Sequence, residues 1–222
     1  MASEAYEEPL DYITNPIGKI VIMGAGQQGR ICKRLAHVLG YAVVAFVDDN
    51  KGNMQVEGIP VYYNAEDIPN YAEYLYFVAV GEIEPRRKFI DKIAELGVGS
   101  LNLVDPSAQI EEGASIGIGN YIYKNAIIYA SAKVGSHNII NCKAVLATDS
   151  EIGDNNNISM GCNICGGVKI GNDTYIGCNS SVVSGYKVGD GAVIAAGSVV
   201  LDDVEAGKFV AGAPAVEKER SK

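Results

Sequence analysis

Three glycines near the start of the chain have a spacing suited to binding phosphate groups. Gly24, Gly26 and Gly29 form a G-x-G-x-x-G pattern directly after a short apolar stretch. The first glycine permits a tight turn, the second lets a phosphate approach the backbone, and the third permits close packing of a helix on a strand. The unpaired amides at the start of that helix, at Gln27 and Gln28, favour an anion. The pattern predicts a site for the phosphates of a nucleotide; a tight turn without a ligand is the alternative.

Two acidic residues follow at the distance expected of such a site. Asp48 and Asp49 end the next apolar stretch, about twenty residues after the third glycine. A carboxylate at this place can hydrogen-bond a ribose or a base edge. The alternative is a solvated acidic end of a strand.

The elements that position these residues alternate between strand and helix. The sequence predicts strands at 19–23, 42–47, 75–80 and 100–104, with helices after the first strand and at 85–96. The apolar face of the first helix is predicted to be Ile31, Leu35, Val38 and Leu39. About 85 residues cannot hold a six-stranded dinucleotide fold, so half of such a fold, binding one nucleotide, is expected.

The second half of the chain repeats every six residues. An aliphatic residue occupies every sixth position from Ile110 to Val200, sixteen times in succession. The residue two places earlier is mostly small, and the one directly after is often glycine. A period of six fits neither a helix face nor an alternating strand. It predicts a parallel β-helix in which three strand-turn units form a triangular coil, so that equivalent aliphatic residues stack from coil to coil.

Turn-forming residues occupy the corners of the predicted coils. Glycine, asparagine and aspartate supply the positive-φ backbone conformations that turns need. Asn155, Asn156 and Asn157 are interpreted in this way, without a ligand. Cys162 and Cys165 form an isolated C-x-x-C, but Cys162 falls on a position for a small buried side chain. A structural role is therefore favoured over a metal or redox role.

Composition and charge argue against several classes of function. The net charge of −9 disfavours nucleic acid or an anionic membrane as the main partner. No apolar run approaches the length of a membrane span, and the acidic start lacks the basic and apolar regions of a signal peptide. The five cysteines, irregularly spaced, are typical of reduced thiols, so a cytoplasmic location is expected.

Several strings, taken in order, resemble one known family. GAGQQGR, FVDDN, AVGEIEPRRK, NLVDPSAQI and FVAGAPA together look like the hexapeptide-repeat sugar acyltransferases. The best-known members N-acetylate UDP-4-amino sugars, and the sialic-acid O-acetyltransferase-like group is closely related. The resemblance covers residues 18–216.

The resemblance implies an architecture and an assembly. It implies an α/β half-Rossmann-like domain that binds a nucleotide sugar at 18–103, followed by an all-β left-handed parallel β-helix, the acyltransferase domain, at 104–216. A mobile segment at 1–17 and a tail at 217–222 complete the chain. Family members typically form trimers with active sites between subunits, so a homotrimer is expected.

The resemblance also implies the ligands and their residues. The first domain would bind a UDP- or dTDP-amino sugar, and the repeat would bind acetyl-CoA as acyl donor, with no metal. The substrate-binding residues would be Gly24, Gly26, Gln27, Gln28, Gly29, Asp48, Asp49, Gly81 and Arg86. The residues around CoA would be Cys165, Gly166, Asn179, Ala195, Ala196, Gly212 and Pro214. A backbone amide near Gly166 would also contact the thioester carbonyl.

The catalytic histidine of the family is replaced in this chain. The family carries a His-Asp or His-Glu pair whose histidine is the general base on the attacking amine, and here Thr148 stands in its place, followed by Asp149. A second family histidine corresponds to Asn157. Because a threonine hydroxyl takes no proton near neutral pH, Asp149 is the candidate base, provided that burial raises its pKa from about 4.

Only two histidines are present, and neither is expected to replace the missing base. His137 falls at a corner of the repeat and is predicted to be a turn residue in solvent; access across a trimer interface is the alternative. His37 lies on a helix flank and is predicted to be a packing or surface residue.

Three functions therefore remain open. The first is an acyl-CoA-dependent transferase, an acetyltransferase, acting on an amino or hydroxyl group of a nucleotide-linked sugar. The second is a catalytically silent homologue that binds a sugar nucleotide. The third is an enzyme that uses NAD or another nucleotide, against which the short first domain counts.

Overall fold

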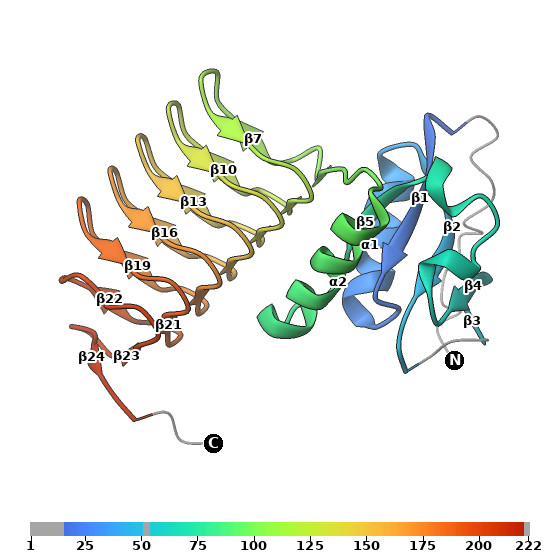
Figure 1. Cartoon of the computed structure of the whole chain (residues 1–222). Helices are drawn as coiled ribbons and strands as arrows, with labels where there is room; N and C mark the ends of the chain where they lie inside the picture. The colour runs from blue at the N-terminus through green and yellow to red at the C-terminus, as the bar shows by residue number, and fades with distance from the viewer. Residues whose placement is uncertain (1–15, 51–53, 220–222) are drawn as a thin grey trace, which may run out of the picture.

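The computed structural model describes residues 16–50 and 54–219. Most of the segment expected to be mobile, 1–17, lies outside these residues. Figure 1 shows an N-terminal α/β domain attached to the first coils of a long β-helix, whose later coils extend away from it. In the described ranges, no helix has the length and apolar character needed to cross a membrane.

The N-terminal domain is a mainly parallel sheet with the predicted strand-helix order. Strands β1 (Gly18–Met23), β2 (Tyr41–Val47) and β5 (Leu75–Val78) are parallel, with β1 in the middle. Helix α1 (Gln27–Val38) connects β1 to β2, and α2 (Ile83–Leu96) follows β5. The carboxyl ends of the parallel strands, and the start of α1, therefore meet at one edge of the sheet.

A short hairpin extends this sheet and was not predicted. Strands β3 (Met54–Val56) and β4 (Ile59–Tyr62) are antiparallel, and β4 pairs with β2. Two 3₁₀ turns, η1 (Ala65–Asp67) and η2 (Tyr71–Glu73), lead from the hairpin to β5.

Two details of the predicted elements were wrong. Val38 is 66% exposed, because α1 buries a face formed by Gly29, Cys32, Leu35 and Ala36 instead. The strand expected at 100–104 is a single bridge between Ser100 and Tyr76 in the domain sheet. It is followed by β6 (Leu103–Val104), which already belongs to the β-helix.

The second half is a stack of triangular coils with three parallel sheets. We name each sheet after the character of its outer face. The docking sheet, which faces the first domain, contains β6, β9 (Tyr121–Ile122), β12 (Ile139–Ile140), β15 (Asn157–Ile158), β18 (Tyr175–Ile176), β21 (Val193–Ile194), β23 (Phe209–Ala211) and the antiparallel β24 (Val216–Glu217). The open sheet contains β7 (Gln109–Ile110), β10 (Ile127–Ile128), β13 (Val145–Leu146), β16 (Asn163–Ile164), β19 (Ser181–Val182) and β22 (Val199–Val200). The charged sheet contains β8 (Ser115–Ile116), β11 (Lys133–Val134), β14 (Glu151–Ile152), β17 (Lys169–Ile170) and β20 (Lys187–Val188).

The six-residue repeat forms the core as predicted. Each of the sixteen aliphatic residues is the second residue of a strand, and all are buried except Ile110 and Ile116 in the first coil. Residues with positive φ recur every six positions from Gly113 to Gly197, three places after each aliphatic residue. The glycines directly after the aliphatic residues have another cause: a Cβ on Gly135 would lie 2.6 Å from the Gly153 carbonyl oxygen.

Buried asparagines form a ladder at the corner between the charged and docking sheets. The Oδ1 of Asn138 accepts the N–H of Asn156 at 2.8 Å, and the Nδ2 of Asn138 donates to Gly153 at 2.9 Å. Asn120 makes the same pair of bonds one coil earlier. The interpretation of residues 155–157 as corner residues is therefore correct only for Asn155, the one of the three with positive φ.

The two domains share an apolar core. Leu103, Tyr121 and Ile139 of the docking sheet belong to the same buried cluster as Ile20 and Phe77 of the N-terminal sheet. Because this contact is a packed core, the glycine loop is held in a fixed position relative to the coils.

Candidate functional site

The glycine loop opens into a cleft between the two domains. The cleft has a volume of about 1570 Å³. On the side of the first domain its lining includes Gly24, Gly26, Gln27, Gln28, Asp48, Asp49 and Gly81. On the side of the β-helix its lining includes Asn157, Asp173, Tyr175, Val193, Ala195 and Phe209. Seven of the nine residues predicted to bind the substrate therefore line one cavity, together with Ala195 from the predicted CoA residues.

The three glycines of the loop differ in what surrounds their Cβ positions. Gly24 has a φ of +108°, and a Cβ there would lie 2.9 Å from the Ala79 carbonyl oxygen. A Cβ on Gly29 would overlap the Gly24 carbonyl oxygen, so this glycine lets α1 pack closely on the loop. A Cβ on Gly26 would meet no atom within 4 Å. Gly26 is thus the one glycine of the three that borders open space, as a phosphate-binding position requires.

The start of α1 is suited to an anion. No side chain caps this end of the helix, and its first turn contains no acidic residue. The first N–H groups of α1 therefore have no carboxylate from the helix itself beside them, and the nearest one, Asp48, already accepts the N–H of Ala25.

The two aspartates after β2 differ in their surroundings. The Asp48 carboxylate accepts the N–H of Ala25 at 2.8 Å and that of Asn50 at 3.0 Å, so it holds the glycine loop in place. Asp49 lies in the cleft with an exposed side chain.

Arg86 does not line the cleft, contrary to the prediction. Its side chain is only 1% exposed, and burial lowers its pKa to about 10. It donates hydrogen bonds to Asn155 and Asn156 in the β-helix and to Val80 and Gly81 at the edge of the cleft. The guanidinium has no N–H left for a ligand.

The predicted catalytic residues occupy the corner between the open and charged sheets. Thr148 and Asp149 are exposed, and Asp149 has a φ of +61°. Gly166 lies one coil further on: its Cβ position is 3.3 Å from the Thr148 carbonyl oxygen, which accepts the N–H of Gly167 at 3.1 Å. Among the described residues, the Gly166 N–H has no hydrogen-bond acceptor, so it can donate to a bound carbonyl oxygen.

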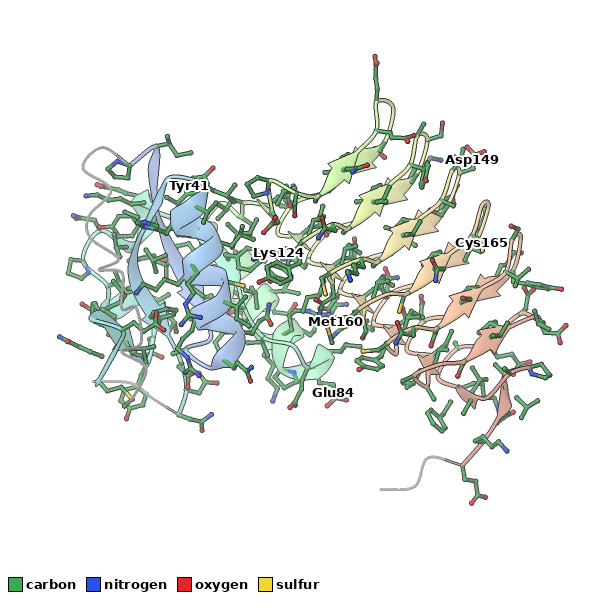
Figure 2. All side chains as sticks on the ribbon, turned by 180° about the vertical axis from the view of Figure 1, so that it is seen from behind. Tyr41, Glu84, Lys124, Asp149, Met160 and Cys165 are labelled. Atoms are coloured by element: carbon green, nitrogen blue, oxygen red, sulfur yellow. The ribbon has the colours of Figure 1, made fainter. Side chains whose placement is uncertain are left out.

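This corner, which we call the catalytic corner after the role predicted for Thr148 and Asp149, lies away from the first domain of the same chain. Figure 2 shows Asp149 and Cys165 on the far side of the coils from α1 and α2. The interdomain cleft and the catalytic corner are therefore separate within one chain. Because Asp149 is exposed here, its desolvation requires a second molecule.

The residues predicted to bind CoA fall on two different corners. Cys165 and Gly166 follow β16, at the corner between the open and charged sheets. The others are at the corner between the docking and open sheets or in the last turns beside it: Asn179, Ala195, Ala196, Gly212 and Pro214. The open sheet separates the two groups within one chain.

The outer face of the open sheet carries almost no charge. Its side chains before and after the core positions are Gln109, Glu111, Ile127, Tyr129, Val145, Ala147, Asn163, Cys165, Ser181, Val183, Val199 and Leu201. Glu111, in the first coil, is the one charged residue among them. The charged sheet differs sharply, since Lys133 and Lys169 both pair with Glu151 on its outer face.

His137 is half-buried in the structure, contrary to the solvent-exposed position predicted for it. It stacks on Gly119 at the corner between the charged and docking sheets, and its Nδ1 is buried without a hydrogen-bond partner. Burial lowers the pKa of His137, while Asp154 opposes this shift and Arg86 and Arg87 add to it. This corner is not an edge of the open sheet, so within one chain His137 does not lie at the corner of Thr148. His37 lies in the last turn of α1.

The cysteines form no metal site among the described residues. Cys162 is fully buried at its small-residue position, as expected, and burial raises the pKa of its thiol to about 11. In residues 16–50 and 54–219, no group of three or more His, Cys, Asp or Glu is arranged to hold a metal ion.

Comparison with known proteins gives matches to both halves of the chain. A model of the PglD N-terminal domain matches residues 19–93, and a model of the bacterial transferase hexapeptide (six repeats) matches residues 167–202.

Solved structures match over nearly the whole chain. A histidine mutant of perosamine N-acetyltransferase from Caulobacter crescentus, in complex with CoA and GDP-perosamine, has 27% identity and a TM-score of 0.87, covering 92% of this chain and 98% of that one. The acetyltransferase domain of PglB from Neisseria gonorrhoeae, in complex with acetyl coenzyme A, has 29% identity and a TM-score of 0.83, covering 90% and 98%. WeeI from Acinetobacter baumannii, at 24% identity with a TM-score of 0.82 and coverage of 90% and 99%, shares the fold.

The fold and the paired domains define an acyltransferase of the hexapeptide-repeat class, with a half-Rossmann-like domain before a left-handed β-helix. Within that class, its matches are to sugar acetyltransferases, with a PglD-type N-terminal domain and structures of perosamine N-acetyltransferase and PglB among them. The family and fold class inferred from the sequence are confirmed.

Proposed function

We propose that the protein transfers an acetyl group from acetyl-CoA to an amino group, or a hydroxyl group, of a nucleotide-linked sugar. Relatives of 27% and 29% identity were crystallised with CoA and GDP-perosamine and with acetyl coenzyme A. The observation that carries the proposal for this chain is the interdomain cleft, which combines the glycine loop with the coils next to the predicted CoA residues. Since acetyl-CoA and sugar nucleotides are metabolites of the cytoplasm, we expect the protein to act there.

The nucleotide would enter the cleft with its phosphates at Gly26 and the start of α1. The uncapped helix end offers N–H groups, and the space beside Gly26 admits an anion. Asp49 would be the hydrogen-bond acceptor for the ribose or the base, since its side chain is exposed in the cleft, whereas the two oxygens of Asp48 each accept a backbone N–H, from Ala25 and from Asn50.

The complete active site would require two chains of a homotrimer. The open sheet is almost uncharged, and its two edges carry the two separate groups of CoA residues. If three copies pack around these sheets, the catalytic corner of one copy meets the docking-open corner of its neighbour, beside the neighbour's cleft. This packing would also bury Asp149.

The chemistry then follows from the corner residues. Asp149 would take a proton from the acceptor amine as its nitrogen attacks the thioester carbonyl of acetyl-CoA. The Gly166 N–H would stabilise the negative charge on the carbonyl oxygen, and CoA would leave as the thiolate. Base catalysis of this kind contributes about 10²–10⁴-fold to the rate.

The first test measures release of free CoA thiol from acetyl-CoA with a panel of UDP-, dTDP- and GDP-amino sugars. Release that depends on one sugar nucleotide supports the proposal. Calorimetric binding of a sugar nucleotide without thiol release would instead establish the silent homologue. Binding of NAD in place of sugar nucleotides would support the third function.

A second test asks whether two chains share a site. Gly26→Val blocks the cleft of its own chain, and Asp149→Asn removes the base from its own corner. With the sugar nucleotide well below the KM of Gly26→Val, each variant alone should keep at most about a tenth of wild-type turnover. A refolded or co-expressed mixture should regain about a quarter, because about one site in four of random trimers has both parts intact. A mixture as inactive as its components would contradict the shared site.

A further inference from the structure

Arg86 is a fully buried charge whose hydrogen-bond partners are all oxygens of carbonyl groups. Its Nε donates to the Asn155 Oδ1 at 2.5 Å, and its Nη2 donates to the Asn155 and Asn156 carbonyls at 2.8 and 3.1 Å. Its Nη1 donates to the carbonyls of Val80 and Gly81, each at 3.3 Å. A buried charge is costly unless it is hydrogen-bonded, and here every N–H of the guanidinium has an acceptor.

These bonds join one wall of the cleft to the β-helix. Val80 and Gly81 follow β5 and line the cleft, whereas Asn155 is a corner residue of the coils and Asn156 continues the asparagine ladder. Asn157 supports the same loop, since its Nδ2 donates to the Gly81 carbonyl at 3.2 Å.

Further hydrogen bonds of Asn155 connect the β-helix to the start of α2. Asn155 has a φ of +56°, and its Nδ2 donates to the Asp173 carboxylate at 2.7 Å and to the Ile83 carbonyl at 3.3 Å. Asp173 also forms an ion pair with Arg87 at 2.5 Å. The start of α2 is thus connected to two successive coils.

We propose that Arg86 is a positioning residue for the sugar nucleotide. It does not touch the ligand; it fixes the segment from Val80 to Gly81 against the coil at Asn155, and so sets the width of the cleft. This inference rests on the proposed function, because it assigns the cleft to the sugar nucleotide.

Arginine is specified by this geometry. The guanidinium presents five N–H donors in fixed directions, so it reaches the carbonyls of the loop and those of the coil at the same time. A lysine has its three donors on a single nitrogen and cannot bond to both groups together. A lysine at position 86 would keep the charge but leave carbonyls of the loop or of the coil without their donors.

The decisive variant is Asn155→Gly, which leaves Arg86 intact. Glycine accepts the positive φ of this position, so the corner keeps its backbone, while Arg86 Nε loses its acceptor and the Ile83 carbonyl at the start of α2 loses its donor. We expect the KM for the sugar nucleotide to rise about tenfold or more, with the KM for acetyl-CoA and kcat changed by less than about twofold. Arg86→Lys should show the same selective effect.

Lys92→Met is the matched control. Lys92 lies on the same helix as Arg86, but its ion pair is with Glu66 inside the first domain, so its replacement removes a contact of α2 without touching the bonds to the β-helix. Both KM values should stay at the wild-type level in this variant.

The outcomes separate the possible roles of Arg86. If Arg86→Lys raises the KM for the sugar nucleotide but Asn155→Gly does not, Arg86 contacts the ligand directly and the inference is overturned. A fall in kcat with equal rises in both KM values would overturn it too, because that pattern indicates general destabilisation of the protein. If Arg86→Lys fails to fold, Asn155→Gly decides alone.

A readout without turnover keeps the inference separate from the proposed function. Hydrogen exchange of the full-length protein should be faster at residues 80–88 in Asn155→Gly than in wild type, and calorimetric binding of UDP or GDP should be weaker. If wild type binds neither nucleotide and releases no thiol, the proposed function fails. Unchanged exchange at 80–88 in the variant would overturn the role of Arg86 in holding the loop.

Discussion

At the scale of single residues, the sequence predicts the glycine loop of the site but not the buried position of Arg86. The glycine loop could be predicted because its function depends on spacing within a few residues. The position of Arg86 could not, because three of its five acceptors belong to residues 69 and 70 places away in the sequence, in the other domain. A basic residue near a glycine loop predicts a phosphate contact, and only the fold shows that this one is buried.

Asp149→Asn should abolish most of the turnover. Asparagine accepts the positive φ at this corner, so the backbone is kept and only the proton acceptor is lost. We expect kcat to fall by about 10²–10⁴-fold with little change in the KM for either substrate. Unchanged steady-state turnover in the thiol-release assay would exclude Asp149 as the base.

Gly26→Val should weaken sugar-nucleotide binding about tenfold or more without unfolding the protein. Its Cβ position is open, so the valine side chain occupies the space of the phosphate rather than a packed region. Calorimetry and a thermal melt measure the two effects. Gly29→Ala is the contrasting variant: its Cβ overlaps the Gly24 carbonyl, so it should destabilise the fold, and a native-like melt there would contradict the assigned packing.

At the scale of elements, the repeat was predictable and the first domain was less so. The aliphatic period of six fixes each coil from local sequence, because every coil contacts only the coils beside it. The β3–β4 hairpin was missed because its strands are three and four residues long and have little apolar alternation. The buried face of α1 was misplaced because Cys32 and Ala36, rather than Val38, face the core.

Protonation of His137 should make the free energy of unfolding depend on pH. Burial lowers the pKa of His137 in the folded state, so the unfolded chain binds a proton more readily. The free energy of unfolding should therefore fall as the pH drops below about 6.5, the ordinary pKa of histidine. His137→Asn, which tolerates the positive φ, should lose less stability between pH 7.5 and pH 5 than wild type. Denaturant unfolding at both values measures the difference, and equal losses would show that His137 contributes nothing.

At the scale of the whole molecule, the almost uncharged open sheet is the surface on which the proposed trimer depends. Val145→Lys places a charge in the middle of this sheet and should convert trimers to monomers, as measured by light scattering. Monomers should keep calorimetric binding of the sugar nucleotide but lose thiol release. Ser115→Lys, on the charged sheet, is the control and should remain trimeric. A trimeric, active Val145→Lys protein would show that the copies meet elsewhere.

The bonds of Arg86 also impose an order on biosynthesis. The first domain leaves the ribosome complete well before Asn155 and Asn156 have been added, since these acceptors follow Arg86 by 69 and 70 residues. Until that coil emerges, the buried arginine lacks three of its acceptors, and the loop beside the glycine turn lacks its anchor. A nascent chain of the first domain alone would therefore hold its nucleotide poorly, and ligand capture would begin only once the third turn of the coil stack is in place.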